Sequence, residues 1–240
     1  NLRQWGWILN QYLEGSEGRF PFGSAVGAWL LRGGSFPGDG QVRPYSVRTE
    51  GIARCPMAVR LAGSRRSVGR TVMWYCPEES TEESKAVWEP AFGFGSTFEA
   101  WQIIAPEPRF RGSYGMNHFL VDGVFGTPGG PRLSTFCIKG KSNVPVLLDC
   151  VTPGTYPHDR DRPPRVPLAL LTSNMAEFCI DRHDGHVNGL FLDWSVRKVG
   201  VKQLWTLRWC GSFNTSGQWT QAGGVRPEDW PEWMTRFKDY

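Results

Sequence analysis

The sequence predicts an α+β fold in which an N-terminal helix lies on an antiparallel β-sheet. Apolar residues recur every three or four positions through residues 2–13, the period of one helical face, and Gly15 and Gly18 provide stop signals after it. Apolar and polar residues alternate through 186–193, and a second short run at 196–199 follows a turn, as in a β-hairpin. The 29 glycines and 18 prolines predict that loops connect these elements.

The composition fits one globular domain, residues 1–240. A chain of 240 residues that is 40% hydrophobic can bury a core without needing a metal or a disulfide. The net charge of +4 is mild and the basic residues are scattered, so no nucleic-acid partner is predicted. No apolar run approaches the roughly 18 residues of a membrane span. The 12 tryptophans and the many turn-forming residues favour an extracytoplasmic protein.

Shorter patterns predict the elements in the middle of the chain. Residues 96–104 fit either a strand or a helix, and 113–123 have the pattern of a strand that ends in a turn. Residues 142–150 are apolar and β-branched, which indicates a buried strand. Residues 156–167 form a proline-rich, charged segment, which predicts a loop that reaches outward.

Two helical segments are predicted near the C-terminus. Apolar residues within 201–208 lie at helical spacing. Asp229 stands before Trp230-Pro231-Glu232, and an acidic cap, an early proline and a glutamate three residues on are typical of a helix start. We therefore expect Asp229 to cap a final short helix.

Motifs for nucleotide binding and catalysis are incomplete. Gly140-Lys141-Ser142 would end a P-loop, but the first glycine of that motif would have to stand where Thr135 is. The sequence contains no G-x-S-x-G nucleophile turn and no H-E-x-x-H zinc motif. We therefore predict no catalytic residue, no cofactor and no enzymatic activity.

Residues 181–193 concentrate five side chains that could bind a metal: Asp181, His183, Asp184, His186 and Asp193. Imidazole and carboxylate groups together suit zinc or another first-row divalent ion. On a strand, however, His183 and His186 would point to opposite faces, so they could share an ion only in a turn. Asp193 lies near the hairpin tip, where aspartate commonly accepts backbone N–H bonds. We favour structural hydrogen bonding here, with His183, His186 and Asp193 as weaker metal candidates and catalysis as a third option.

The spacing of His183 and Asp193, with nine residues between them, resembles the C-terminal H-x9-D-G motif of bacterial pilin-like proteins with prepilin-type N-terminal cleavage and methylation. Residues 182–209, RHDGHVNGLFLDWSVRKVGVKQLWTLRW, are similar to the C-terminal hairpin and helix of that family. The opening NLRQWGWILNQYLEGSEGRFP is similar to the stretch that follows the family's membrane-inserted helix. Four shorter segments resemble family segments in the same order: RCPMA, SYGMN, NVPVLLDC and AGGVRPEDWPEWM.

The resemblance implies a non-enzymatic pilin or type II secretion pseudopilin. Such a subunit assembles with identical or related subunits into an extracytoplasmic filament or pseudopilus. Residues 1–14 would be the end of a pilin-type long helix, and 183–210 would be the hairpin-helix motif. The helix starts uncapped at Asn1, and we expect an apolar half upstream of it to make the only membrane contact. The family's glycine after the aspartate is Trp194 here, so the tight turn must be made without a glycine at positive φ.

An extracytoplasmic setting allows disulfides to persist, so we expect at least one among the six cysteines. The spacings include no C-x-x-C pair and leave the pairing open. We favour Cys55–Cys76, because both cysteines precede a proline and lie in or beside a loop-rich region. Buried free thiols are the alternative for several of the others.

Two other functions stay open. A secreted binding module would use exposed tryptophan faces to stack a glycan, which is therefore a possible partner. A metal-dependent hydrolase would use the region of His183 and Asp193 and would need three ligands and an open position. In the pilin-like interpretation, residues 156–167 and 211–240 are the predicted subunit contacts.

Overall fold

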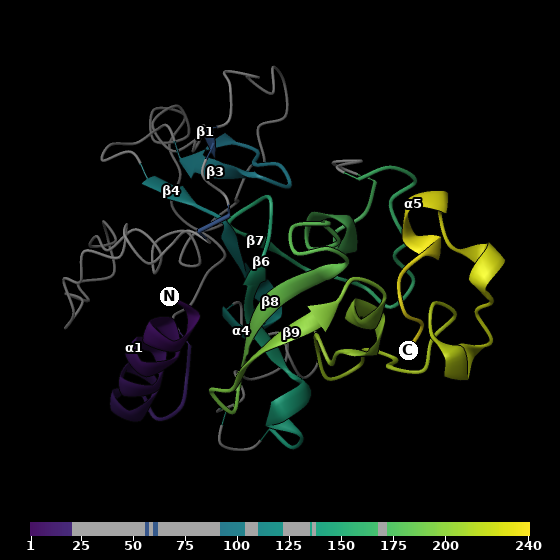
Figure 1. The fold of residues 1–240 in the computed structure, drawn as a ribbon. Coiled ribbons are helices and arrows are strands. Elements are labelled where there is room, and N and C mark those ends of the chain that lie inside the picture. The colour runs from purple at the N-terminus through teal and green to yellow at the C-terminus, as the bar shows by residue number, and fades with distance from the viewer. Residues whose placement is uncertain are drawn as a thin grey trace, which may run out of the picture.

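A computed structural model gives the fold (Figure 1) and describes residues 1–20, 56–57, 60–61, 92–103, 110–121, 135, 138–167 and 172–240. The α-helices are α1 (Leu2–Gly15), α4 (His118–Val121) and α5 (Glu232–Thr235). The strands are β1 (Arg60–Leu61), β2 (Phe92–Gly93), β3 (Glu99–Ile103), β4 (Phe110–Gly112), β5 (Tyr114–Asn117), β6 (Pro145–Asp149), β7 (Gly154–Thr155), β8 (His186–Phe191) and β9 (Val196–Gly200). Short 3-10 helices lie at Lys141–Asn143, Met175–Glu177, Lys202–Thr206, Gln221–Gly223 and Pro227–Asp229. This mixture makes the fold α+β.

The central sheet has the strand order β7-β5-β6-β8-β9. Its pairs are antiparallel, as expected, except for the edge pair of β5 and β7, which is parallel. The exception arises because the chain reverses after β6 and reaches the far side of β5, so that β7 runs in the direction of β5. A second sheet has the order β1-β3-β2, with β4 also paired to β3, and its β1–β3 pair is parallel too.

Helix α1 lies beside the central sheet and buries four apolar residues at helical spacing: Leu2, Trp5, Leu9 and Leu13. The helix contacts β8, and a Cβ placed at Gly6 would lie 3.0 Å from Leu190 Cδ1. A glycine here lowers helix propensity but permits this close approach. Trp7, one position on, is 67% exposed. The predicted helix is confirmed, and its end is marked by Gly18 at a φ of 73°, whose N–H donates to the carbonyl of Leu13.

The C-terminal hairpin and the buried strand of the core are also confirmed. Strands β8 and β9 pair antiparallel, with Val187 opposite Val199. All five residues of β6 are buried, as the apolar run 142–150 predicts. A strand buried on both faces needs a continuous apolar sequence, because neither side meets water.

The segment 96–104 contains strand β3, which is one of its two predicted alternatives. Three other predictions differ from the observed structure. The segment 113–123 contains β5 followed by the helical turn α4 and not by a simple turn. The helical spacing at 201–208 corresponds to a short 3-10 helix, Lys202–Thr206. Asp229 does not cap the last helix: it ends the 3-10 helix Pro227–Asp229, while α5 begins after Pro231. The Asp229 carboxylate instead accepts the backbone N–H of Arg226 at 2.8 Å.

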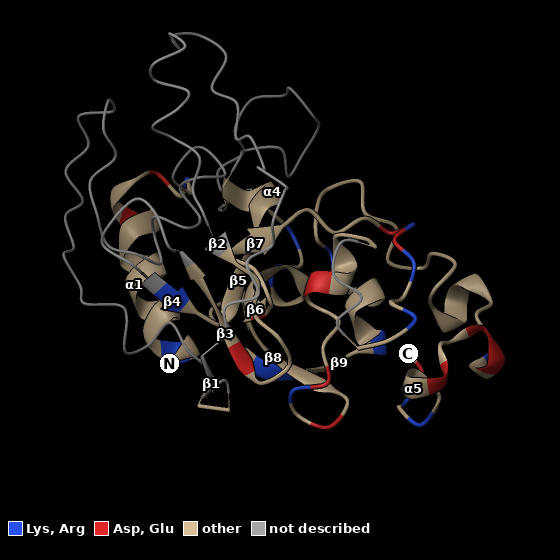
Figure 2. Cartoon of the chain, turned by 90° about the horizontal axis from the view of Figure 1, so that it is seen from above, with Lys and Arg blue, Asp and Glu red and all other residues tan. Residues whose placement is uncertain are grey.

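The favoured disulfide, Cys55–Cys76, lies outside the described residues. Within them, Cys150, Cys179 and Cys210 are free and buried, as in the thiol alternative. No helix of the described part combines the length and apolar character that a membrane crossing requires. Figure 2 shows blue and red segments intermixed over the described part of the chain, in keeping with the mild net charge.

Candidate functional site

A buried ionic network fastens the start of the hairpin to β6. Asp149, the last residue of β6, has a fully buried carboxylate. Its Oδ1 accepts a hydrogen bond from Arg182 Nη1 at 2.8 Å. Its Oδ2 accepts the N–H of Asn188 at 2.8 Å and lies 3.1 Å from His183 Nε2, whose other neighbour is the Asn188 side-chain amide at 2.8 Å. The histidine of the H-x9-D spacing is therefore hydrogen-bonded to a carboxylate, as a structural histidine should be.

The charge of Asp149 is well compensated. Burial by itself would raise the pKa of Asp149, but the hydrogen bond from His183, the charge of Arg182 and the N–H of Asn188 outweigh it and lower the pKa. The Arg182 side chain is also fully buried and donates to the carbonyls of Ser96, Thr97 and Ser113. The same arginine therefore ties the loop before β3 to the central sheet.

The hairpin tip is held by the aspartate of the motif. Asp193 Oδ1 accepts the N–H of Ser195 at 3.0 Å and its hydroxyl at 2.6 Å. Trp194 between them has a φ of 66°. The turn is therefore made without a glycine: Trp194 itself adopts the left-handed backbone conformation that glycine favours. Packing of the Trp194 side chain against the core offsets the local strain.

The three metal candidates have separate partners. His183 contacts Asp149, His186 Nδ1 lies 2.9 Å from the carbonyl of Asp184, and Asp193 holds the hairpin tip. Within the described ranges, no three His, Cys, Asp or Glu side chains come together as ion ligands. A cavity of about 350 Å³ next to the start of α1 is lined in part by His183 and Asn188.

A second polar cluster joins the residues that follow β6 to the 3-10 helix Met175–Glu177. Thr152 Oγ1 donates to Glu177 Oε2, and Cys150 Sγ lies 3.4 Å from Thr152 Oγ1. Burial raises the pKa of Glu177 to about 7 and, together with the Glu177 charge, raises the pKa of Cys150 to about 12. A thiol with so high a pKa stays protonated and is a poor nucleophile. This cluster therefore gives no support to cysteine catalysis.

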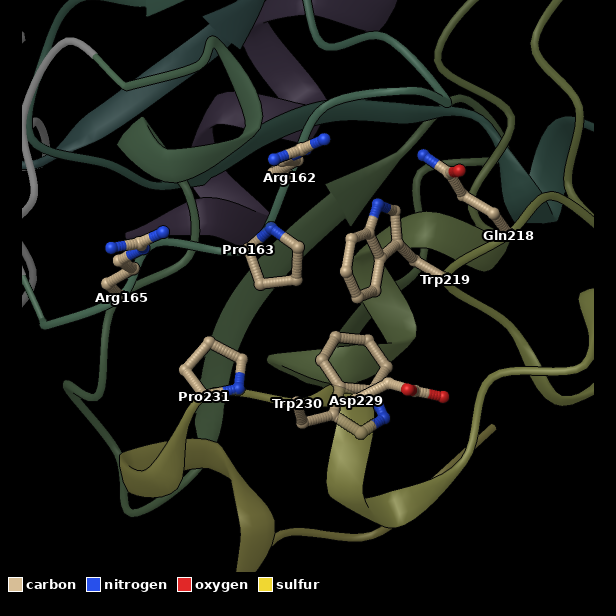
Figure 3. A pocket seen from close by; sticks show the side chains of 8 residues that line it. All are labelled: Arg162, Pro163, Arg165, Gln218, Trp219, Asp229, Trp230 and Pro231. Atoms are coloured by element: carbon tan, nitrogen blue, oxygen red, sulfur yellow. The ribbon is translucent and has the colours of Figure 1, made fainter.

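A separate cavity of about 450 Å³ lies where the loop 156–167 meets the C-terminal segment (Figure 3). We call it the Trp–Arg pocket; its lining residues are Arg162, Pro163, Arg165, Gln218, Trp219, Asp229, Trp230 and Pro231. Figure 3 shows the two prolines on one side, the two tryptophans on the other and Arg162 at one end. The two segments that were predicted as subunit contacts are therefore brought together at one site.

The Trp–Arg pocket has an uncompensated positive charge. Among the described residues, the guanidinium groups of Arg162 and Arg165 have neither an ion pair nor a hydrogen bond. The only acid of the lining, Asp229, is held by Arg226 through the backbone N–H at 2.8 Å and Nε at 3.5 Å. Arg226 is itself shared with Glu228 at 3.3 Å, so within the described residues the lining holds two unpaired guanidinium groups and one partly compensated carboxylate.

Two indole N–H groups at the pocket also have no acceptor within the described part of the chain. Trp219 Nε1 and Trp230 Nε1 are both buried and without a hydrogen bond. Other buried indoles nearby are satisfied, since Trp205, Trp209 and Trp233 donate to backbone carbonyls at 2.8, 2.9 and 2.8 Å. Buried polar groups are usually paired, so these two donors are exceptions; both are buried and are not part of the open surface of the pocket.

Sequence reasoning missed Asp149, Arg182 and the Trp–Arg pocket. The available signal for the first two was a charged residue at the end of an apolar strand and another beside His183, because a charge in an apolar context needs a partner. In comparisons with protein-family models, curated proteins and solved structures, the chain matched none. The function is therefore argued from the sequence and the geometry.

Proposed function

We propose that this domain is the extracytoplasmic head of a pilin-like or pseudopilin-like subunit, which acts by assembling with identical or related subunits and not by catalysis. The observation that carries the proposal is the association of α1 with the hairpin. The helix contacts β8, and β8 is joined to β6 by strand pairing and by the hydrogen bond from Asn188 N–H to Asp149. If the head holds the helix rigidly, the orientation of each head relative to its neighbours in a filament is fixed.

The hairpin geometry supports the proposal from the residues of the motif. In the pilin-like family the residue after the aspartate is glycine, and the corresponding Trp194 has a φ of 66°. Glycine is the usual residue for that backbone conformation, so the motif and this hairpin agree in the turn they require. His183 and Asp193 occupy the two ends of the same unit, one fixing its base and the other its tip.

The outer face of α1 offers a surface for a neighbour. Trp7 is 67% exposed, while Trp5 on the opposite face is buried. Tryptophan is enriched in protein interfaces because it buries a large area at little cost in side-chain freedom. We therefore propose Trp7 as a point of contact between subunits.

The proposal is tested on the complete gene product. The reading frame upstream of residue 1 should encode an apolar stretch of about 20 residues that is retained in the protein. Copies carrying Trp7→Cys should then form disulfide-linked dimers in sheared filaments, whereas Lys198→Cys, an exposed residue of β9, serves as the matched control. A secreted monomer without a retained apolar stretch would contradict the proposal and favour a binding module.

A further inference from the structure

We propose that the Trp–Arg pocket binds a saccharide that carries a carboxylate, such as a uronic acid residue of an acidic polysaccharide. The proposal does not depend on assembly, because a subunit head and a secreted module could both expose this site. It starts from the cavity of about 450 Å³, which is large enough for one or two sugar rings.

The charge of the pocket selects an anion. Arg162 and Arg165 are exposed and are without an acidic partner in the described chain, while Asp229 is already held by Arg226. A planar guanidinium group matches a carboxylate with two parallel N–H···O bonds. An anion that enters the pocket therefore meets the guanidinium groups of Arg162 and Arg165, which are unpaired among the described residues. The one carboxylate of the lining, Asp229, is paired with Arg226.

The walls of the pocket select a ring. Pro163 and Trp230 are buried and form its deep part, and Trp219 and Pro231 are partly buried beside them. The Trp219 and Trp230 rings lie 5.6 Å apart at an angle of 47° and pack against one another, so Trp219, the more exposed of the two, is the ring left to contact a ligand. The C–H face of a sugar ring fits such aromatic and prolyl surfaces, whereas a bare inorganic anion would leave them without contact.

The exposed Gln218 side chain also lines the pocket and can exchange hydrogen bonds with sugar hydroxyl groups. Trp219 Nε1 and Trp230 Nε1 have no acceptor among the described residues, but both atoms are buried and a ligand in the pocket does not reach them in this structure. A sugar hydroxyl that pairs with Gln218 gains specificity over a ligand that cannot.

The test is a calorimetric titration of the whole chain with digalacturonate and, in parallel, with its uncharged dimethyl ester. We expect saturable binding of digalacturonate and binding of the ester weaker by about tenfold, which corresponds to about 1.4 kcal/mol. Acetate, inorganic phosphate and tetraglutamate are the comparison anions, and each should bind more weakly than digalacturonate. Loss of affinity should accompany a rise in salt concentration, because the arginines are exposed.

Variants locate the binding. Arg162→Ala combined with Arg165→Ala should weaken digalacturonate binding by about tenfold or more. Arg160→Ala removes an exposed arginine of the same loop that does not line the pocket, and it should leave the affinity unchanged. Trp219→Ala should also weaken binding, and Trp219→Phe, which keeps a stacking ring, should weaken it less while preserving the fold.

Several results would overturn the proposal. Equal affinity for the dimethyl ester would remove the role of the carboxylate, and equal affinity for phosphate or acetate would reduce the pocket to a simple anion site. Tighter binding of tetraglutamate would point to an acidic protein partner instead. Equal losses in Arg160→Ala and in the double variant would show non-specific attraction, and no heat with digalacturonate at millimolar concentration would exclude the site.

Discussion

Replacing the carboxylate of Asp149 tests whether the buried network holds the hairpin. In Asp149→Asn one oxygen can still accept from Arg182 at the 2.8 Å position, but an NH2 group then faces the donors of His183 and Asn188. The buried guanidinium also loses its counter-charge. Removing one partner of a buried ion pair costs about 3–5 kcal/mol, a large fraction of the roughly 5–15 kcal/mol that stabilises a typical domain.

The assay is urea unfolding at pH 7, followed by tryptophan fluorescence. Asp193→Asn is the matched control, because among the described residues this exposed aspartate bonds only Ser195 and asparagine keeps an accepting oxygen, so we expect a loss below about 1 kcal/mol. His183→Ala should lie between them, at about 1–3 kcal/mol. A loss below about 1 kcal/mol in Asp149→Asn, or an equal loss in the control, would refute the network as the fastening of the hairpin.

The same network gives a pH dependence. The pKa of Asp149 is lowered below its usual 3.8 in the folded state, so the unfolded chain takes up a proton first as the pH falls. The stabilisation is therefore fully present above pH 3.8 and is lost as the pH falls through the lowered folded pKa. The difference in unfolding free energy between the wild type and Asp149→Asn should narrow at these acidic pH values. A difference that stays constant down to the acid transition would show that the carboxylate charge is not responsible.

Three further predictions concern other positions. At Trp194, whose φ is 66°, Gly should be more stable than Ala by about 1 kcal/mol in urea melts, whereas at Lys198 in β9 the order should be reversed. The pKa of Glu177 is raised from 4.5 to about 7, so between these pH values the folded state keeps a proton that the unfolded state has lost. The free energy of unfolding should therefore fall by up to about 3 kcal/mol as the pH rises from 4.5 to about 7, and Glu177→Gln should abolish that fall in thermal melts. The buried Cys150 and Cys179, whose pKa values are raised by burial, should react with a thiol reagent at pH 8 only after unfolding, and rapid labelling of the native protein would contradict their burial.

The sequence predicted the elements whose patterns are local. The helix through 2–13 and the hairpin of β8 and β9 follow from periodicities within a dozen residues, and the structure contains both. The Asp149–Arg182 pair joins residues 33 positions apart, and neither a helical nor a strand period connects them. The positive φ of Trp194 could not be predicted for a different reason: this backbone conformation is usual for glycine, and here the packing of a large side chain holds it.

The Trp–Arg pocket could not be deduced because its two walls are distant in the sequence. The loop 156–167 and the segment 211–240 were each predicted as surfaces of contact, on the ground of their proline and tryptophan content. Nothing in either segment indicated that they face one another, since the bond from Trp233 Nε1 to the carbonyl of Pro164 spans 69 residues. Tertiary contacts of this kind decide where a binding site forms, and local patterns do not contain them.

The expected assembly contacts lie on two different surfaces, the Trp–Arg pocket and the outer face of α1, and saccharide binding distinguishes between them. If the loop 156–167 and the C-terminal segment are subunit contacts, a neighbouring head would cover Arg162 and Trp219, and digalacturonate should bind the isolated domain but not the assembled form. If assembly uses the outer face of α1 around Trp7, the pocket stays open and both forms should bind the saccharide equally. The titration should therefore be repeated on sheared filaments at matched subunit concentration. If filaments still bind the saccharide, the Trp–Arg pocket is exposed in the assembly, as expected for a contact on α1. If filaments lose that binding, the pocket itself lies in the interface. In that second case, Arg162→Ala with Arg165→Ala should weaken assembly, and Arg160→Ala should not.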